Sequence, residues 1–271
     1  MDYVLFFFQI VFYTLGAAMI CGLLVGLCER LFMILMGTGA GRGVVIGTSL
    51  IGTPVHELSH ALMCLAFGHK IKKIVLWQPS SQDGTLGYVT HTYQPRNLYQ
   101  NLGNLFIGIG PVFGGMGIIV LAMLLGFPHT LDAYFEAVSD MVGAGDGIGD
   151  ILVEGLKMIP GMVEEFSADD VPVWARVIAL VIMFSVSLHI NLSPADIKGA
   201  ATAIPLYLAL VLIPTVIISL MGESAMGDTR QGLQVFSALM FALFTLVFVF
   251  VLLQLIVGLV VYMLRRLFSR R

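Results

Sequence analysis

Long runs of apolar residues, separated by short polar segments, set the pattern of this chain. A run of about 20 mostly apolar residues is long enough for a helix to cross a bilayer. The pattern predicts such helices at about residues 3–27, 43–68, 102–126, 173–191, 200–221 and 235–264. We therefore expect an all-α polytopic membrane protein with about six transmembrane helices.

Composition supports this prediction and excludes other classes of protein. The chain is 58% hydrophobic and only 11% charged, whereas a soluble domain carries about 25% charged residues. A net charge of −3 without a basic patch argues against nucleic acid as a partner, and the expected surroundings are a lipid bilayer. The cysteines lack the spacing of a disulfide framework or zinc finger, so we expect small apolar packing roles for Cys21, Cys28 and Cys64.

Two segments between the predicted spans have patterns of their own. Residues 70–94 contain two runs rich in β-branched and aromatic residues around a turn segment at 79–84, which predicts a β-hairpin. Residues 128–172 are strongly acidic and predict two short amphipathic helices in a solvated, extracytoplasmic cap. The predicted parts are an N-terminal transmembrane helix with a connecting loop (1–42), a membrane core with hairpin and cap (43–199), and two C-terminal helices with a basic tail (200–271).

The distribution of lysine and arginine sets the predicted orientation, because positive charge favours the cytoplasmic side. With both termini cytoplasmic, the hairpin and the tail lie inside and the acidic segment lies outside. We expect this orientation in the cytoplasmic membrane of a prokaryote. Nine of the 14 basic residues then lie inside: Lys70, Lys72, Lys73, Arg96, Lys198, Arg265, Arg266, Arg270 and Arg271.

The second predicted span carries three ionisable residues in the spacing H-E-x-x-H. Ionisable side chains inside a span are costly and mark functional sites. On a helix, His56 and His60 lie one turn apart on one face, where both imidazoles can bind one metal ion. Glu57 lies about 100° further round the helix, which suits a general base better than a ligand. The same motif occurs by chance on exposed helices, but inside hydrocarbon these side chains require partners or an ion.

The fourth predicted span ends in a second polar cluster. Pro194 breaks the helix there, next to Asn191, Ser193 and Asp196. A broken backbone at membrane depth is tolerated where it is buried or lines a cavity. Three histidines are expected to lie away from any such site: His69, His91 and His129.

The sequence resembles the site-2 protease family of intramembrane zinc metalloproteases. The resemblance rests on HELSH at residues 56–60, on the element from Gly108 to Pro111 in the next span, and on NLSPAD at residues 191–196. The order of these motifs and the hairpin between the first two also match. The resemblance covers about residues 43–196 and implies a three-helix catalytic core that cleaves transmembrane or membrane-proximal substrates.

The resemblance also implies roles for individual residues. Three of them would be ligands of a Zn²⁺ ion: His56, His60 and Asp196. Glu57 would be the base. His189, two residues before Asn191, is the alternative third ligand, although two histidines and a carboxylate are a familiar hydrolytic zinc set. Asn191 is placed to donate a hydrogen bond to a developing oxyanion.

We therefore expect zinc-dependent hydrolysis of peptide bonds in membrane-protein or peptide substrates, as in regulated proteolysis. The sequence is also compatible with an accessory membrane subunit. Two alternatives use the same ligands without catalysis, namely a metal transporter or sensor and a protease-like scaffold that binds its partner without cutting it. Glu57 discriminates between these classes, because transport needs ligands but no general base.

Overall fold

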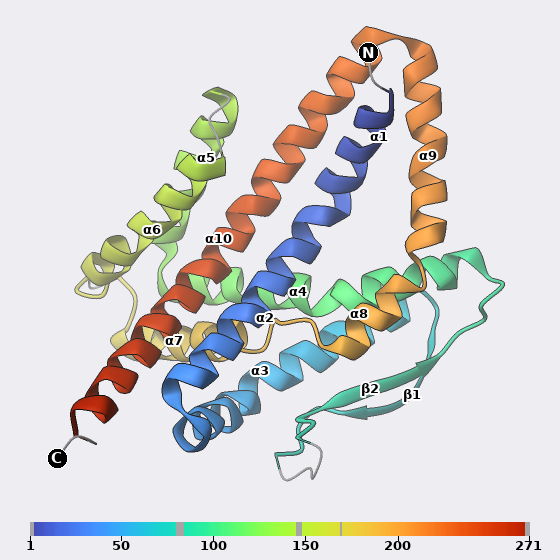
Figure 1. The fold of residues 1–271 in the computed structure, drawn as a ribbon. Coiled ribbons are helices and arrows are strands. Elements are labelled where there is room, and N and C mark those ends of the chain that lie inside the picture. Colours follow the sequence, from blue (N-terminus) through green and yellow to red (C-terminus); the bar gives the residue numbers. More distant parts are fainter. Residues whose placement is uncertain (1–2, 80–83, 145–147, 169, 269–271) are drawn as a thin grey trace.

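Helices form most of the protein in the computed structural model (Figure 1). The residues that the structure describes are 3–79, 84–144, 148–168 and 170–268. Within them, helices form most of every predicted span, and a two-stranded sheet follows the second one. The all-α class with a small hairpin is therefore confirmed. The middle of the predicted turn, Asp146 and Asp169 of the acidic segment, and the end of the basic tail lie outside the described residues.

The N-terminal helix is longer than its apolar run predicts. Before the hairpin the chain forms α1 (Tyr3–Val11), a π-helical turn (Phe12–Gly16), α2 (Ala17–Met36) and α3 (Thr38–Ala66). Gly37 alone separates α2 from α3, and its φ of 75° is a conformation that favours glycine. The loop predicted between residues 27 and 43 is therefore wrong, and Glu29 lies inside a helix.

Among the described residues, four helical stretches are long and apolar enough to cross a membrane: Ala18–Met36, Leu98–Gly126, Ile204–Met221 and Glu223–Leu267. Such stretches characterise an integral membrane protein, as predicted. α3 is not one of them, because polar side chains such as His56 and Glu57 lower its mean hydropathy. α7 (Val173–Ser187) is apolar but has only 15 residues. The six-span count, which includes α3 and α7, stays a prediction.

Three helices form the packed centre that positions the candidate site. α3, α4 (Leu98–Gly126) and α7 all contact one another. Small residues allow helix backbones to approach closely. A Cβ on Gly114 of α4 would collide with the Ser59 side chain of α3, and a Cβ on Gly115 would collide with Ile190. The glycines of α4 are therefore required for this close packing.

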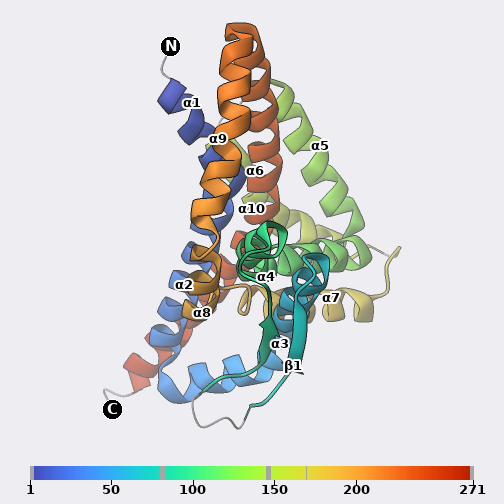
Figure 2. The same cartoon turned by 90° about the vertical axis from the view of Figure 1, so that its right-hand side faces the viewer.

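The predicted hairpin is present and lies beside α3 (Figure 2). β1 (Lys70–Val75) pairs antiparallel with β2 (Tyr88–Thr92). Beyond β1, the Trp77 indole Nε1 donates a hydrogen bond of 2.9 Å to Ser49 Oγ on α3. The hairpin is therefore attached to α3 along its length as well as through the chain connection at residue 68.

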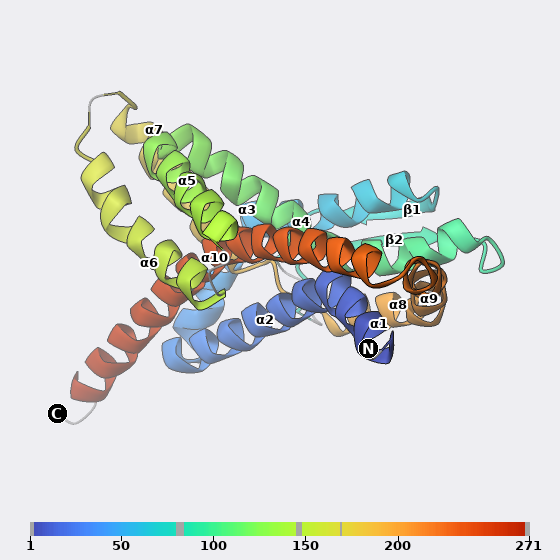
Figure 3. The ribbon, with the colours of Figure 1, turned by 90° about the horizontal axis from the view of Figure 1, so that it is seen from above.

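The acidic segment forms two helices, as predicted, which pack against the long last helix. α5 (Pro128–Ala144) and α6 (Ile148–Glu165) contact each other and α10 (Glu223–Phe268), as Figure 3 shows from above. The Tyr134 hydroxyl of α5 donates a hydrogen bond of 2.9 Å to Ala242 O of α10. Their apolar faces belong to the protein core, whereas exposed positions of α5 carry acids: Asp132, Glu136 and Asp140.

The chain breaks before Pro194, as predicted, but α7 ends at Ser187, earlier than the predicted span, and Pro194 begins the next helix. Residues 188–193 are not helical, and the chain continues as α8 (Pro194–Ala201) and α9 (Ile204–Met221). α8 packs against α4 where α4 has Gly108, because a Cβ there would lie 2.6 Å from Asp196 O. Gly108 therefore permits the contact that brings the start of α8 to the core.

Candidate metal centre

The structure brings together the three predicted zinc ligands. His60 Nε2 lies 3.1 Å from His56 Nε2 and 3.1 Å from Asp196 Oδ1. The other carboxylate oxygen, Asp196 Oδ2, lies 3.7 Å from His56 Nε2. The histidines come from α3 and the aspartate from the first turn of α8, so the cluster joins segments more than 130 residues apart.

Backbone carbonyls determine which nitrogen of each histidine faces the cluster. His56 Nδ1 lies 2.7 Å from His189 O, and His60 Nδ1 lies 2.7 Å from Ile107 O. A carbonyl oxygen only accepts hydrogen bonds, so both Nδ1 atoms carry the proton. In the neutral rings both Nε2 atoms then present lone pairs toward each other and toward Asp196. A second hydrogen bond of this kind is the usual companion of a metal-bound histidine.

Asp196 adds a full negative charge to these two lone pairs. Burial acts to raise the pKa of Asp196, but the facing rings of His56 and His60 lower it more, so its pKa lies well below the usual range. Three acceptors this close together are stable only around a cation, which is a proton on one ring or a metal ion.

The dimensions of the cluster fit zinc. Two nitrogen ligands of a tetrahedral zinc, each about 2.0–2.1 Å from the metal, lie about 3.3 Å apart. The two 3.1 Å separations at His60 Nε2 are close to this value. Two histidines and one carboxylate also leave one coordination position open, as catalytic zinc sites do.

Pro111 explains why His60 finds its acceptor on α4. In a regular helix Ile107 O would accept the N–H of residue 111. Proline has no N–H, so this carbonyl is open, and His60 Nδ1 donates to it. His189 O is open for a related reason, since it lies just beyond the last residue of α7, where carbonyls lack helical donors.

A capping box fixes Asp196 in the first turn of α8. Ser193 is the N-cap, and its Oγ accepts the Asp196 N–H at 3.2 Å. In return the Ser193 N–H donates to Asp196 Oδ2 at 2.8 Å, which leaves Oδ1 to face His60. An N-cap of this type stabilises a helix by about 1 kcal/mol. The sequence signal for this helix start is the Ser-Pro-Ala-Asp spacing. Pro194 alone indicates that a helix ends, but it does not indicate that a new helix begins here.

Glu57 and the cluster line one cavity of ≈ 990 Å³. Glu57 is only 6% exposed, and the chain before β2 runs against it. A Cβ on Gly87 would lie 2.9 Å from Glu57 Cγ and 2.7 Å from Thr53 Cγ2. Thr53 Oγ1 is buried and has no hydrogen-bond partner among the described residues. The cavity therefore joins a carboxylate, an unused hydroxyl and the three candidate ligands.

Glu29 is a residue of this cavity that the sequence analysis missed. It extends from α2, and the Asn191 carboxamide donates a hydrogen bond to its Oε2. Asn191, the predicted oxyanion donor, therefore lies in the cavity, and one of its two N–H groups is hydrogen-bonded to Glu29. The signal was available in the sequence, because the apolar pattern resumes after Arg30 and places Glu29 within a longer apolar helix.

Of the remaining histidines, His189 and His91 line the cavity, whereas His69 and His129 are not among its lining residues. The His189 ring lines the cavity, but its Nε2 lies 3.1 Å from Thr48 Oγ1 and is not part of the ligand cluster. The prediction that His91 lies away from the site is wrong, because His91 lines the same cavity from β2. The His129 side chain is 71% exposed and contacts Asp170 in the acidic segment.

Comparisons with known proteins do not identify a family for this chain. The chain matches no protein-family model, and neither curated proteins nor solved structures give a match. The functional argument therefore rests on the residues of the cavity and on the motifs of the sequence.

Proposed function

We propose that this protein is an intramembrane zinc metalloprotease of the site-2 protease type. The observation that carries the proposal is the convergence of His56, His60 and Asp196 beside Glu57 in one cavity. The substrates are peptide bonds of membrane-embedded or membrane-proximal proteins. The site supports this choice, because it is built on α3 and packs against α4, one of the helices apolar enough to cross a membrane.

Each residue has a distinct role in this proposal. His56, His60 and Asp196 would hold a zinc ion, which when bound supplies Lewis-acid activation of water and of the scissile carbonyl. Glu57 takes the proton of the attacking water and later passes it to the leaving amine. Asn191 has two N–H donors, so its bond to Glu29 leaves one for the oxyanion of the substrate.

The hairpin is suited to hold the substrate in an extended conformation. A helical substrate must unwind before its amide can reach the cluster. β2 pairs with β1 along one edge, and its residues Tyr88, Val89 and His91 line the cavity. An extended segment can therefore add to the other edge of β2 by β-augmentation, in which backbone hydrogen bonds provide the affinity.

The presence of Glu57 favours catalysis over two other classes of function. A metal transporter or sensor would use the same three ligands, and a protease-like scaffold would bind a membrane partner without cutting it. Neither requires a carboxylate beside the ligands and turned to the same cavity. An accessory membrane subunit is compatible with any of these functions.

The first prediction concerns metal content. Replacing both His56 and His60 by alanine should remove one zinc per chain from the purified full-length protein, measured by elemental analysis. The physical reason is that a carboxylate alone is a poor zinc site. His129→Ala, in the acidic segment, is the matched control and should leave the zinc content unchanged. Equal zinc content in the double variant and the wild type would contradict the proposed centre.

The second prediction concerns orientation. We propose six spans, with the hairpin and both termini on the cytoplasmic side of a prokaryotic membrane and the acidic segment outside, from the positive-charge bias. Single cysteines introduced at Ser139 of α5 and Lys72 of β1, both exposed positions, should react with a membrane-impermeant reagent from opposite sides. The unsubstituted protein controls for labelling of the native cysteines. Labelling of both positions from one side contradicts the proposed topology.

A further inference from the structure

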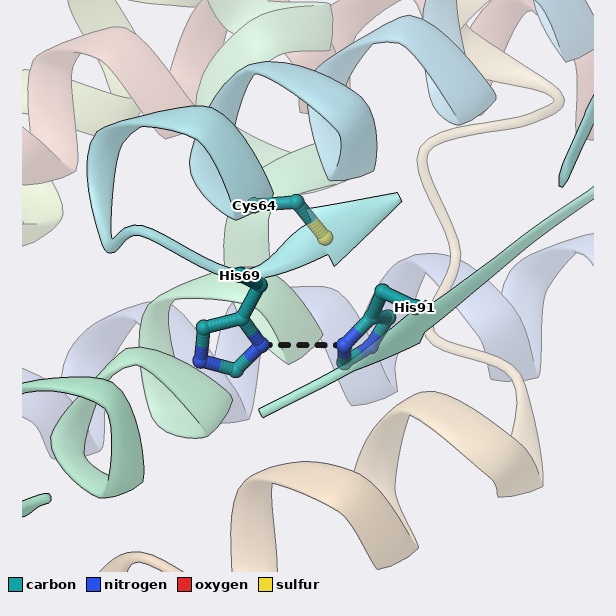
Figure 4. A group of neighbouring side chains, drawn as sticks. All are labelled: Cys64, His69 and His91. Atoms are coloured by element: carbon teal, nitrogen blue, oxygen red, sulfur yellow. Dashed lines mark hydrogen bonds between the residues drawn. The ribbon is translucent and has the colours of Figure 1, made fainter. Parts of the chain in front are cut away.

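A second group of metal-ligand side chains lies at the end of α3 (Figure 4). It consists of Cys64, His69 and His91, whose ligand atoms all lie within 4.8 Å of one another. His69 Nδ1 lies 2.9 Å from His91 Nδ1, and Figure 4 shows the Cys64 Sγ turned toward this pair. Cys64 is fully buried and His69 is 4% exposed. Two of the three side chains are therefore buried, and His91 is half-buried beside them.

The turn that ends α3 places His69 over Cys64. The His69 N–H donates to Cys64 O at 2.8 Å, and the Gly68 N–H donates to Leu65 O at 3.1 Å. These two bonds form a Schellman motif, in which the residue after the left-handed glycine returns to the last helical turn. Gly68 has a φ of 69°. The turn thus brings together two side chains that are five residues apart.

The hairpin register supplies the third side chain. His91 of β2 lies opposite Ile71 of β1, close to the start of the strand that follows His69. The ring of Tyr93 stacks on the ring of His69, with centroids 5.0 Å apart and an interplanar angle of 11°. These contacts hold His69 and His91 in fixed positions.

A backbone carbonyl sets the protonation of the pair. His69 Nε2 lies 2.7 Å from Gln100 O, and because a carbonyl only accepts, this nitrogen carries the proton. Nδ1 of neutral His69 is then an acceptor that faces His91 and Cys64. In the bond of 2.9 Å between the two Nδ1 atoms, His91 is therefore the donor. A neutral imidazole can move its proton to Nε2 and offer Nδ1 to a metal ion.

We infer that Cys64, His69 and His91 bind a second zinc ion, separate from the site proposed for catalysis. The Cys64 thiol loses its proton to water on binding, as a zinc thiolate requires. His69 Nδ1 and His91 Nδ1 are the other two ligands. The bond from His69 Nε2 to Gln100 O is the companion hydrogen bond that orients a metal-bound histidine. This inference is independent of the proposed catalytic activity.

A comparison within the protein supports this assignment. The group of His129, Glu165 and Asp170 also has ligand atoms close together, but its carboxylates already have partners. Glu165 accepts from the backbone N–H groups of His129 and Thr130, and Asp170 forms an ion pair of 2.8 Å with Arg176. No comparable partner for the Cys64 Sγ is present in the part of the chain that the structure describes.

The second ion would connect the hairpin to the helix that carries His56 and His60. Cys64 lies one turn beyond His60 on α3, whereas His91 belongs to the strand that lines the cavity. A bond network through one ion therefore fixes β2 relative to the candidate catalytic centre. Zinc in this place is structural, with an effect on the position of β2.

Elemental analysis and cobalt absorption test this site in the full-length protein. After removal of metals with a chelator, the wild type should rebind two Zn²⁺ per chain, and Cys64→Ser should rebind one. With Co²⁺, the wild type should show thiolate-to-cobalt charge-transfer absorption, because the His56, His60 and Asp196 centre contains no sulfur. Cys64→Ser and His91→Gln should both lose this absorption, whereas the matched control Cys28→Ser should keep it.

The outcomes separate this site from the proposed catalytic centre. Replacement of both His56 and His60 by alanine should lose one zinc and keep the thiolate absorption. If that double variant keeps all its zinc while Cys64→Ser loses one, the proposed catalytic centre is wrong and the second site is correct. Absence of thiolate absorption in cobalt-loaded wild type, or its persistence in Cys64→Ser, overturns the second site. Zinc should also slow hydrogen exchange in residues 88–92 of the wild type but not of Cys64→Ser.

Discussion

Replacing Glu57 by glutamine is expected to lower peptide-bond cleavage by roughly 10²–10⁴-fold, the usual effect of losing a positioned general base. The change preserves the size of the side chain and leaves the ligands in place, so zinc content should stay at the wild-type level. Cleavage is measured by mass spectrometry on single-span membrane proteins incubated with purified enzyme. Glu136→Gln, at an exposed position of α5, is the matched control.

The same variant also tests how the substrate binds. Because Glu57→Gln binds a substrate without releasing products, a photo-crosslinking residue at position 89 of β2 should capture it. The same residue at position 72 of β1, on the other strand, should not. If Glu57→Gln cleaved at the wild-type rate, the hydrolytic mechanism would be refuted, and a transporter, a sensor or a scaffold would be favoured.

The second large effect is expected at Asp196. Asp196→Asn replaces a charged ligand by a neutral, weaker one that has a single acceptor oxygen. That oxygen cannot both accept the Ser193 N–H and face the metal, as the two carboxylate oxygens do. Changes in residues that only orient metal ligands reduce metal affinity by about 10–100-fold, so loss of a ligand should exceed about 100-fold. Zinc affinity is measured by competition with a chromophoric chelator, and cleavage should fall in parallel.

His189→Ala is the control that distinguishes the two candidate third ligands. The His189 ring contacts Thr48, and only its backbone carbonyl accepts the bond from His56. Alanine keeps that carbonyl, so zinc affinity should stay at the wild-type level, without the loss of about 10–100-fold that follows removal of a group orienting a ligand. If His189→Ala lost most of its zinc and Asp196→Asn retained all of it, His189 would be the third ligand in place of Asp196.

Much of the architecture could be predicted because it depends on local patterns. Apolar runs identify the helices, and β-branched runs around a turn segment identify the hairpin. The first helix was predicted too short because Glu29 looks like the end of an apolar span. The apolar pattern after Arg30 places Glu29 inside a longer helix, but its contact with Asn191, 162 residues away, depends on the tertiary structure.

The ligand residues of the candidate centre can be predicted from the sequence, but the backbone groups that orient them cannot. The His56 and His60 spacing follows from helix geometry alone. The role of Pro111 does not, because it acts through the backbone carbonyl of Ile107 and contributes no ligand atom. The grouping of His69 with His91 depends on a helix-ending turn and on strand register, so neither residue looked functional in sequence.

His60 faces the candidate metal and also donates a hydrogen bond to Ile107 O, the carbonyl of α4 that Pro111 leaves without a helical donor. If His60 is mutated, a buried carbonyl loses its donor, which costs about 1–3 kcal/mol. Chelation removes only the ion and leaves this bond between α3 and α4 intact. Loss of activity in a His60 variant therefore reports folding and chemistry together. In Cys64→Ser, which lacks the second site, chelation followed by restoration with zinc is reversible and isolates the chemistry of the candidate catalytic ion.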